Sequence, residues 1–373
     1  MSQLNEIGKG KVVLFVNAIR SDLLSGGNSS TTQILEQFKK NSCLYEFNLS
    51  KNKKGLLKVI NIIVGLPGSI FVILNRHTKF VAFEFLTRLS LFTYIQFGIK
   101  CYTLKPDVIV FNHHASFLYS LGFNKVDKVF IWHDIPSIKD YENTTRLSRA
   151  ASKISIIFEK IIVRKSLKHF AFSFADQKFF KRFHGCDLGL LPIMLQKSDK
   201  NTQVQNVNAW LMLGNWSRNE NREGASQFFN IYATLAREHH YNIIQFVIAG
   251  NAADKFLEIL LKNSKNCKLN ITAIPYYENL SNLKVNGLLA PITQGAGIKV
   301  KVLESWASGL PVIGTSKAFS GLPKNIQKIG GIRVSNIIEM VNLIISDKAI
   351  NTKSLRPHSA YLEYLDAIKI SQN

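Results

Sequence analysis

The chain is poor in acidic residues and in cysteine, and both shortages exclude classes of protein. It has 25 Asp and Glu against 47 Lys and Arg, a formal net charge of +22, which favours a polyanion or an anionic membrane surface as partner. Its few cysteines lie far apart, in neither a metal-ligand cluster nor the disulfide framework of a small secreted domain. We therefore predict buried thiols in a reducing compartment, at Cys43, Cys101, Cys186 and Cys267.

Three recognisable motifs are also missing from the sequence. It contains no Asp-x-Asp metal motif, no signature of a DNA- or RNA-binding module and no signal-peptide layout, since the apolar run at 12–16 is too short for one. From this pattern we expect a metal-independent cytoplasmic protein that needs no cofactor and has no nucleic-acid partner. Binding of nucleic acid through net charge alone stays open as an alternative, which would be salt-dependent.

No uninterrupted apolar run is long enough to span a bilayer cleanly. The stretch 56–74 approaches the required ~20 residues but is broken by Lys58, Asn61 and the Pro67-Gly68 pair. The stretch 80–97 reads as a helix with a wide apolar face. Both segments can pack on a sheet. The alternative is partial burial at the membrane interface, on the inner face of the plasma membrane, with nearby basic residues meeting lipid headgroups: Lys51, Lys53, Lys54, Arg76 and Lys79.

Apolar strands and helical stretches alternate along the 373 residues, a length for which two domains are the default expectation. Buried strands are expected near 12–18, 126–132, 209–214 and 243–249, and the polar stretch 198–208 reads as a linker. The sequence therefore predicts an α/β protein with two doubly wound domains. We assign residues 1–195 to the first domain, 209–345 to the second and 346–373 to a C-terminal helical segment that packs back on the first domain.

The stretch from Thr293 to Thr315 carries the most information. Gly295 and Gly297 allow a free backbone turn and a close approach to a ligand, and the helix that follows directs N–H groups at this loop, which suits a phosphate. Gly309 ends the helix, and Pro-Val-Ile starts the next strand.

Helical periodicity places the side chains of this helix on two faces. Val300, Leu303 and Ala307 share one face, whereas Lys301, Glu304, Ser305 and Ser308 fall on another. Glu304 lies about two turns in, roughly 10 Å along the axis, near the reach from a bound diphosphate to its ribose. The plainer alternative is a tight turn followed by a helix with a solvated carboxylate.

The pattern Gly-x-Gly-Ile-Lys-x-Lys-x-Leu-Glu, followed by Ala-x-Gly-x-Pro-Val-Ile-x-Thr, resembles the donor-site motif of retaining glycosyltransferases of family 4. The resemblance implies the GT-B fold, two Rossmann-like domains facing a cleft. It also implies that the amides of Gly295, Ala296 and Gly297 hold the donor diphosphate, with Lys299 and Lys301 near the phosphates and Glu304 on the ribose hydroxyls. Ala296 stands where the family often has a second glutamate, so contacts to the transferred sugar must come from elsewhere.

Other candidate residues follow the ends of predicted strands, where open α/β sheets bind ligands. The resemblance implies that Gly26 and Gly27 face the donor phosphates, that Arg218 helps to clamp them, and that His133 and Asp134 lie in the active site. From the residues alone, His133 is either a group that orients a sugar hydroxyl or handles a proton, or a structural His bonded to the backbone. His113 and His114 stay open between the same two roles.

Together these patterns predict a glycosyltransferase, of hexosyltransferase type, that uses a nucleotide diphosphate sugar. The basic charge and apolar helices favour a saccharide or lipid-linked saccharide acceptor in bacterial surface polysaccharide synthesis, such as lipopolysaccharide. Amides and cations would stabilise the leaving diphosphate, with retention of configuration by analogy with the family. The alternatives are a nucleotide-sugar hydrolase or epimerase, and a non-catalytic membrane-surface or polyanion-binding protein with a degenerate GT-B fold.

Overall fold

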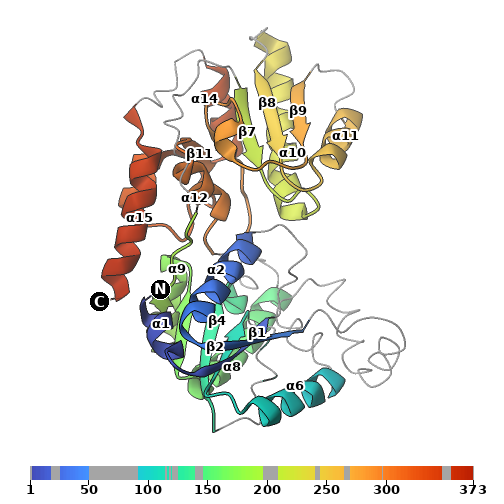
Figure 1. Ribbon diagram of the computed structural model, residues 1–373. Coiled ribbons are helices and arrows are strands. Elements are labelled where there is room, and N and C mark those ends of the chain that lie inside the picture. Colours follow the sequence, from blue (N-terminus) through green and yellow to red (C-terminus); the bar gives the residue numbers. More distant parts are fainter. Residues whose placement is uncertain are drawn as a thin grey trace. The chain divides into compact units, whose positions relative to one another are not determined.

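The computed structural model describes residues 2–17, 26–49, 91–113, 116, 119, 125–138, 146–195, 209–239, 244–263, 269–295, 297–346 and 354–372. The chain divides into two compact units, Met1–Pro192 with Ser371–Asn373, and Ile193–Ile370. Each unit is built on one six-stranded sheet whose strand pairs are all parallel. The α/β class with two parallel sheets flanked by helices is thus confirmed (Figure 1).

In the first unit the sheet has the strand order β2-β1-β3-β4-β5-β6. Its strands are β1 (Val12–Asn17), β2 (Cys43–Asn48), β3 (Val108–Asn112), β4 (Asp127–Trp132), β5 (Lys168–Ala171) and β6 (Gly189–Leu190). The strand order reverses direction between β1 and β3. The carboxyl ends of this pair therefore flank a switch point, where open α/β sheets bind ligands.

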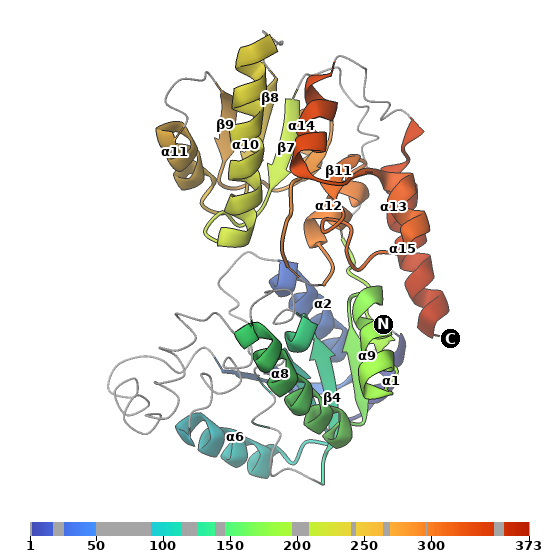
Figure 2. The same cartoon turned by 180° about the vertical axis from the view of Figure 1, so that it is seen from behind.

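Helices cover both faces of this first sheet. One face packs on α6 (Leu91–Leu104), α8 (Arg146–Lys165) and α9 (Phe174–His184), which share a core with Phe111, Phe130 and Trp132; α8 and α9 lie in front of β4 in Figure 2. The other face meets α2 (Gly26–Asn41), whose Phe38 ring lies 6.4 Å from that of Phe15, and α1 (Ser2–Gly8) packs on α2. Ser173 caps the beginning of α9, because its Oγ accepts from the Asp176 amide at 3.3 Å.

In the second unit the order is β12-β11-β10-β7-β8-β9, and the switch point lies between β7 and β10. Its strands are β7 (Ala209–Leu213), β8 (Gln245–Ala249), β9 (Asn270–Ile274), β10 (Leu288–Ala290), β11 (Val312–Thr315) and β12 (Gly331–Val334). All residues of β7, β10 and β11 are buried, as central parallel strands require.

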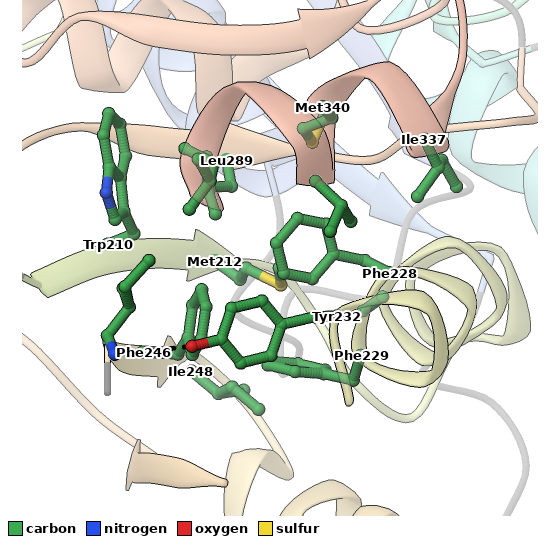
Figure 3. Close-up of a cluster of buried hydrophobic side chains, with 14 of the residues drawn as sticks. Trp210, Met212, Phe228, Phe229, Tyr232, Phe246, Ile248, Leu289, Ile337 and Met340 are labelled. Atoms are coloured by element: carbon green, nitrogen blue, oxygen red, sulfur yellow. Dashed lines mark hydrogen bonds between the residues drawn. The ribbon is translucent and has the colours of Figure 1, made fainter. Parts of the chain in front are cut away.

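A large aromatic core fills one face of the second sheet. It joins the strands to α10 (Asn219–His239), α11 (Ala253–Asn263) and α14 (Ile337–Ile345), and Figure 3 shows Phe228, Phe229 and Tyr232 of α10 around Phe246. Ring centroids of Tyr232 and Phe246 are 4.9 Å apart with the planes at 82°, an edge-to-face arrangement that aromatic pairs favour. This packing fixes the start of α10, which leaves β7 at the switch point.

The remaining helices of this unit are α12 (Val300–Ala307), α13 (Lys324–Gly330), the short η2 (Leu280–Asn282) and α15 (Pro357–Gln372). Trp306 of α12 donates to the carbonyl of Gly330 at 2.8 Å. The Tyr361 hydroxyl of α15 donates to the carbonyl of Ile193 at 3.1 Å, so α15 is tied to the segment that enters the second unit. The predicted return of residues 346–373 to the first domain stays a prediction.

Three sequence-based expectations need correction or lie outside the described residues. Cys43 is exposed rather than buried, because it opens β2 at the edge of its sheet, whereas Cys101 is buried and Cys186 is intermediate; Cys267 is not among the described residues. The stretch 56–74 and residues 80–90 also lie outside the described part, and α6 begins at Leu91. Among the helices of the described residues, none is long and apolar enough to cross a membrane.

The two-face prediction for α12 is only half right. Leu303 and Ala307 are buried as expected, but Ser305 and Ser308 are buried too, together with Val302 and Trp306. The Ser305 hydroxyl donates to the carbonyl of Leu310 at 3.1 Å, a contact that periodicity does not reveal. The open face of α12 is therefore narrow. It carries Lys301 and Glu304, the two side chains on which the candidate site depends.

Candidate functional site

The loop that leads from β10 into α12 needs its glycines. Gly295 has φ +102° and Gly297 has φ +71°, a region that side chains other than glycine rarely adopt. Lys299 folds back over the loop, and its ammonium donates to the carbonyls of Gly295 at 2.8 Å and Gly297 at 3.3 Å. The Ser320 hydroxyl donates to the same Gly297 carbonyl at 3.0 Å. The bonds from Lys299 therefore direct the carbonyls of Gly295 and Gly297 towards its ammonium group. Ala296 lies outside the described residues.

Lys301 joins the first turn of α12 to the loop after β7. Its Nζ donates to Oδ1 of Asn221 at 2.9 Å, and Nδ2 of Asn221 donates to the carbonyl of Asn215 at 2.8 Å. The approach is possible because residue 214 is glycine: a Cβ there would lie 3.1 Å from Cγ of Asn221 and 3.3 Å from Nζ of Lys301. The two loops that flank the switch point of the second sheet are thereby fastened together.

A cluster of positive charge surrounds Lys301. Burial, and to a smaller extent the nearby charges of Lys299 and Arg218, lower the pKa of Lys301 to about 7, whereas the charge of Glu304 opposes the shift. Arg218 lies in the turn between β7 and α10, with Nε 3.7 Å from Oε2 of Glu220. Because these cations crowd a partly buried place, an anionic ligand would relieve their mutual repulsion. The electrostatics of the loop therefore favour a phosphate or diphosphate.

Glu304, one turn farther along α12, has a partner that sequence reasoning missed. The hydroxyl of Tyr277 donates to its Oε1 at 3.0 Å. Burial raises the pKa of Glu304, while the Tyr277 hydrogen bond and the charge of Lys301 lower it. Burial and the neighbouring carboxylate raise the pKa of Tyr277, which keeps its hydroxyl protonated as a donor. A carboxylate held in this way can accept hydrogen bonds from vicinal hydroxyl groups of a sugar.

Of the residues predicted for donor binding, the structure brings Gly295, Gly297, Lys299, Lys301, Arg218 and Glu304 to one end of the second sheet. Sequence reasoning did not single out Asn221 or Tyr277 as site residues. A weak signal existed for both, since Asn221 opens α10 after β7 and Tyr277 follows β9 by three residues. Both positions belong to the carboxyl edge of a parallel sheet.

The first unit holds the other predicted residues, and here a buried amide links three elements. His133 follows β4, and its Nε2 lies 2.7 Å from Oδ1 of Asn112 at the end of β3. Nδ2 of Asn112 donates to Oδ1 of Asn17 at 3.1 Å and to Oγ1 of Thr31 at 2.9 Å. His133 is thus bonded to a side chain, and not only to the backbone as its plainer interpretation assumed.

The remaining candidates of the first unit lie near this network or outside the described part. Gly26 and Gly27 form the beginning of α2, the helix that also carries Thr31. Asp134 follows His133 and is partly buried. The ring of His113, whose φ is +82°, lies 6.0 Å from that of His133; His114 is not described. Within the described ranges, no group of three His, Cys, Asp or Glu residues could hold a metal ion.

Comparison with protein families gives a match for the second unit of the chain. Residues 208–346 match the family model described as Glycosyl transferases group 1, which covers the β7 to α14 region with the whole loop–α12 site. No curated protein matches the chain as a sequence.

Solved structures share the fold of the whole chain at low sequence identity. Sucrose-phosphate synthase from Thermosynechococcus elongatus has a TM-score of 0.63 at 12% identity, and the match covers 96% of each chain. Anabaena HepE in complex with UDP-glucose has a TM-score of 0.62 at 11% identity over 97% of each chain. A trehalose-6-phosphate structure from E. coli, bound with UDP-2-fluoro glucose, has a TM-score of 0.57 at 14% identity over 96% of each chain.

These matches and the two parallel six-stranded sheets place the chain in the GT-B fold, with two Rossmann-like domains. Residues 208–346 accordingly form a domain of the group 1 glycosyltransferases, within a chain of GT-B fold.

Proposed function

We propose that the second unit binds a UDP-sugar and that the enzyme transfers the sugar, with retention, to a saccharide or lipid-linked saccharide. The observation that carries the proposal is the cluster of Lys299, Lys301 and Arg218 beside the Tyr277-held carboxylate of Glu304. A diphosphate carries the negative charge that the cations can bind, and a ribose carries the vicinal hydroxyl groups that the carboxylate can accept from. The choice of UDP as the nucleotide of the donor is supported by two structures of the same fold, which hold UDP-glucose and UDP-2-fluoro glucose.

The proposed chemistry asks little of a side-chain nucleophile. As the bond from the anomeric carbon to the diphosphate breaks, negative charge develops on the leaving oxygen. In this proposal the backbone amides of the donor loop and the cations Lys299, Lys301 and Arg218 stabilise that charge. Ala296 contributes only its backbone to this role. Glu304 holds the ribose, and no step requires a metal ion.

In this proposal His133 and Asp134 act on the sugar or on the acceptor hydroxyl, and Gly26 and Gly27 let the start of α2 approach the donor. His133 is suited to the role because a buried network fixes its ring at the carboxyl edge of the first sheet. Domain closure around a cleft would exclude water and limit hydrolysis of the donor. Without domain closure, water could reach the donor, and the hydrolase alternative would be favoured.

The lipid-linked acceptor and a peripheral membrane location are supported by the outer surface of α6 and α8. These helices cover the same face of the first sheet, and apolar side chains stand exposed on both: Ile95, Ile99 and Tyr102 on α6, Ile154 and Ile157 on α8. Arg149, Lys153, Lys160 and Arg164 are exposed along α8, whose one acidic residue, Glu159, is buried. Apolar groups amid cations suit the surface of an anionic bilayer. Surface polysaccharide assembly, as of lipopolysaccharide, is the pathway we propose.

The experiment is sugar transfer from labelled UDP-glucose and other UDP-sugars to lipid-linked saccharides, read as labelled lipid and as free sugar. We expect labelled lipid to exceed free sugar, and Glu304→Ala to abolish both donor binding and transfer. Glu304→Gln keeps the volume and a partner for Tyr277, and should also bind donor poorly. Glu258→Ala on the exposed face of α11 is the matched control and should behave as wild type.

The outcomes separate the alternatives. Free sugar without labelled lipid would identify a hydrolase. Vesicle binding that survives Glu304→Ala, together with no turnover on any donor, would identify a degenerate surface-binding protein. Tight, salt-dependent oligonucleotide binding that does not depend on Glu304 would indicate a nucleic-acid partner instead.

A further inference from the structure

A buried polar network joins three elements beneath the carboxyl edge of the first sheet. Asn112 at its centre has a relative exposure of 0%, and its partners Asn17 and Thr31 are buried as well. Asn17 and Asn112 end the neighbouring strands β1 and β3 and are paired in register, while Thr31 comes from α2. His133 is the network's outer member and is only partly buried. The sheet register therefore fixes the position of the amide that His133 meets.

The hydrogen bonds of Asn112 determine which atom faces His133. Its amide has two N–H hydrogens, and these go to Oδ1 of Asn17 at 3.1 Å and to Oγ1 of Thr31 at 2.9 Å. The atom 2.7 Å from Nε2 of His133 is Oδ1, which can only accept. In this orientation of the Asn112 amide, Nε2 of His133 is the donor. In the neutral ring only one nitrogen carries hydrogen, so Nδ1 holds the lone pair.

We propose that Asn112 is a positioning residue that holds His133 in its Nε2–H tautomer, so that a sugar hydroxyl donates its hydrogen bond to Nδ1. The inference rests on the proposed role of His133 at the sugar or acceptor, but the tautomer itself is a property of the protein without ligand. His133 accepts at Nδ1 only while it is neutral, because both nitrogens of a protonated ring are donors. Protonation places the new hydrogen on Nδ1 and leaves the bond to Asn112 intact.

The neutral amide of Asn112 explains how His133 keeps one tautomer without being driven towards its protonated form. An aspartate there would also accept from Nε2, but its negative charge would favour protonated His133 and so disable Nδ1 as an acceptor. A leucine would leave Nε2 without this acceptor and remove the preference between tautomers. The neutral amide therefore selects the tautomer without adding charge. Two titratable side chains close to His133 in the described part are Asp134, the next residue in the chain, and His113, 6.0 Å away between ring centroids.

The test is a long-range ¹H–¹⁵N correlation NMR spectrum of full-length protein labelled at histidine, recorded above the pH at which His133 titrates. The signals of His133 are assigned by their loss in His133→Gln. We expect the pattern of an Nε2–H tautomer in the wild type. An Nδ1–H pattern would overturn the proposal, and the tautomer is read from the wild-type protein itself. It is also obtained without substrate, so inactivity on every UDP-sugar would defeat the proposed function and still leave the tautomer decided.

Variants of residue 112 test whether Asn112 determines the tautomer of His133. Asn112→Leu should give a mixture of tautomers or the Nδ1–H form, and lower kcat at least tenfold with a smaller change in the donor KM. Asn112→Asp should keep the Nε2–H pattern, raise the pKa of His133, and shift the acid limb of the rate profile to higher pH while activity at alkaline pH recovers. Asn48→Leu, at the end of the neighbouring strand β2, is the matched control. An unchanged tautomer in Asn112→Leu, or an unshifted acid limb in Asn112→Asp, would assign Asn112 a structural role only.

Discussion

Single side chains define the chemistry of this enzyme, and Lys301 shows how burial adjusts it. Its ammonium is desolvated beside two other cations, and its pKa falls to about 7. In the ligand-free protein Lys301 is thus charged below about pH 7 and increasingly neutral above it. A bound diphosphate stabilises the charged form, so donor binding raises the pKa and takes up a proton.

From this linkage we predict that UDP-glucose binds more weakly as the pH rises from 6 to 8, with a loss approaching about tenfold per pH unit at the alkaline end. Titration calorimetry in two buffers of different ionisation enthalpy measures both the affinity and the proton uptake. Lys301→Arg, whose charge is permanent, should flatten the pH dependence, and Lys324→Arg on the exposed surface of α13 should not. A pH-independent affinity in the wild type would contradict this role of Lys301.

Tyr277 offers a second test at the scale of one atom. Removal of its hydroxyl in Tyr277→Phe leaves Glu304 without its donor, and a hydrogen bond to a charged group contributes about 1.5–3 kcal/mol. We therefore expect the free energy of unfolding to fall by about 1.5–3 kcal/mol, and donor affinity to fall as well because Glu304 loses the bond that orients it. Tyr276→Phe is the control, since this neighbouring side chain is 64% exposed. Equal behaviour of the two variants in calorimetry would count against the Tyr277–Glu304 pair.

At the scale of elements, the two switch points determine which side chains can meet. The loop–helix–strand run from 293 to 315 was predictable because glycine, periodicity and proline mark its boundaries locally, and α12 and β11 confirm it. The strand expected near 126–132, just before His133, is confirmed as β4. The bonds of Asn112 to Thr31 and of Lys301 to Asn221 join residues 81 and 80 positions apart. No local pattern encodes which partner such a side chain will find.

The burial of Ser305 and Trp306 was missed for a related reason. Periodicity assumes one apolar face per helix, whereas α12 is enclosed both by its sheet and by α13 and α15. Only Lys301 and Glu304 of its expected polar face reach the candidate site. Sequence reasoning therefore drew the polar face of this helix too wide.

Close contact between α10 and the end of β10 gives a prediction at this scale. A Cβ at Gly224 would lie 1.7 Å from the carbonyl oxygen of Pro291, just ahead of the donor loop. We expect Gly224→Ala to push α10 away from the loop and lower the free energy of unfolding by about 1–3 kcal/mol, as overpacking does. Urea denaturation measures it, with Asn230→Ala on the exposed face of α10 as the control. A stability within error of the wild type would show that the helix and loop move apart without cost.

For the molecule as a whole, the net charge is +22. Part of this positive charge lies beside exposed apolar side chains, which bears on how the protein could meet a membrane. The exposed surface of α6 and α8 combines cations with apolar side chains, among them Tyr102 at 82% and Ile99 at 62% exposure. Electrostatic attraction and shallow insertion would together hold the enzyme near a lipid-linked acceptor. Salt weakens the electrostatic attraction, and replacement of the apolar side chains weakens the insertion.

We predict that the protein floats with vesicles containing anionic lipid at low salt and dissociates as salt is raised. Replacement of Lys153, Lys160 and Arg164 by Glu should abolish flotation. The same change of charge at Lys255, Lys262 and Lys328 of the second unit should reduce it far less. Equal losses in both triple variants would mean that net charge, and not this surface, governs the association; recovery of the wild type only in the soluble fraction would remove the membrane proposal.

The central claim, that the loop at 295–297 and Glu304 form a site for a nucleotide sugar, is tested most directly by thermal unfolding in a panel of nucleotides and nucleotide sugars. A ligand that binds only the folded protein raises its apparent stability in proportion to the logarithm of ligand concentration over Kd. We predict a selective rise in Tm with UDP and a UDP-sugar, which Glu304→Ala loses and Glu258→Ala keeps. A wild-type Tm that no nucleotide sugar raises, or a rise that survives Glu304→Ala unchanged, would contradict it.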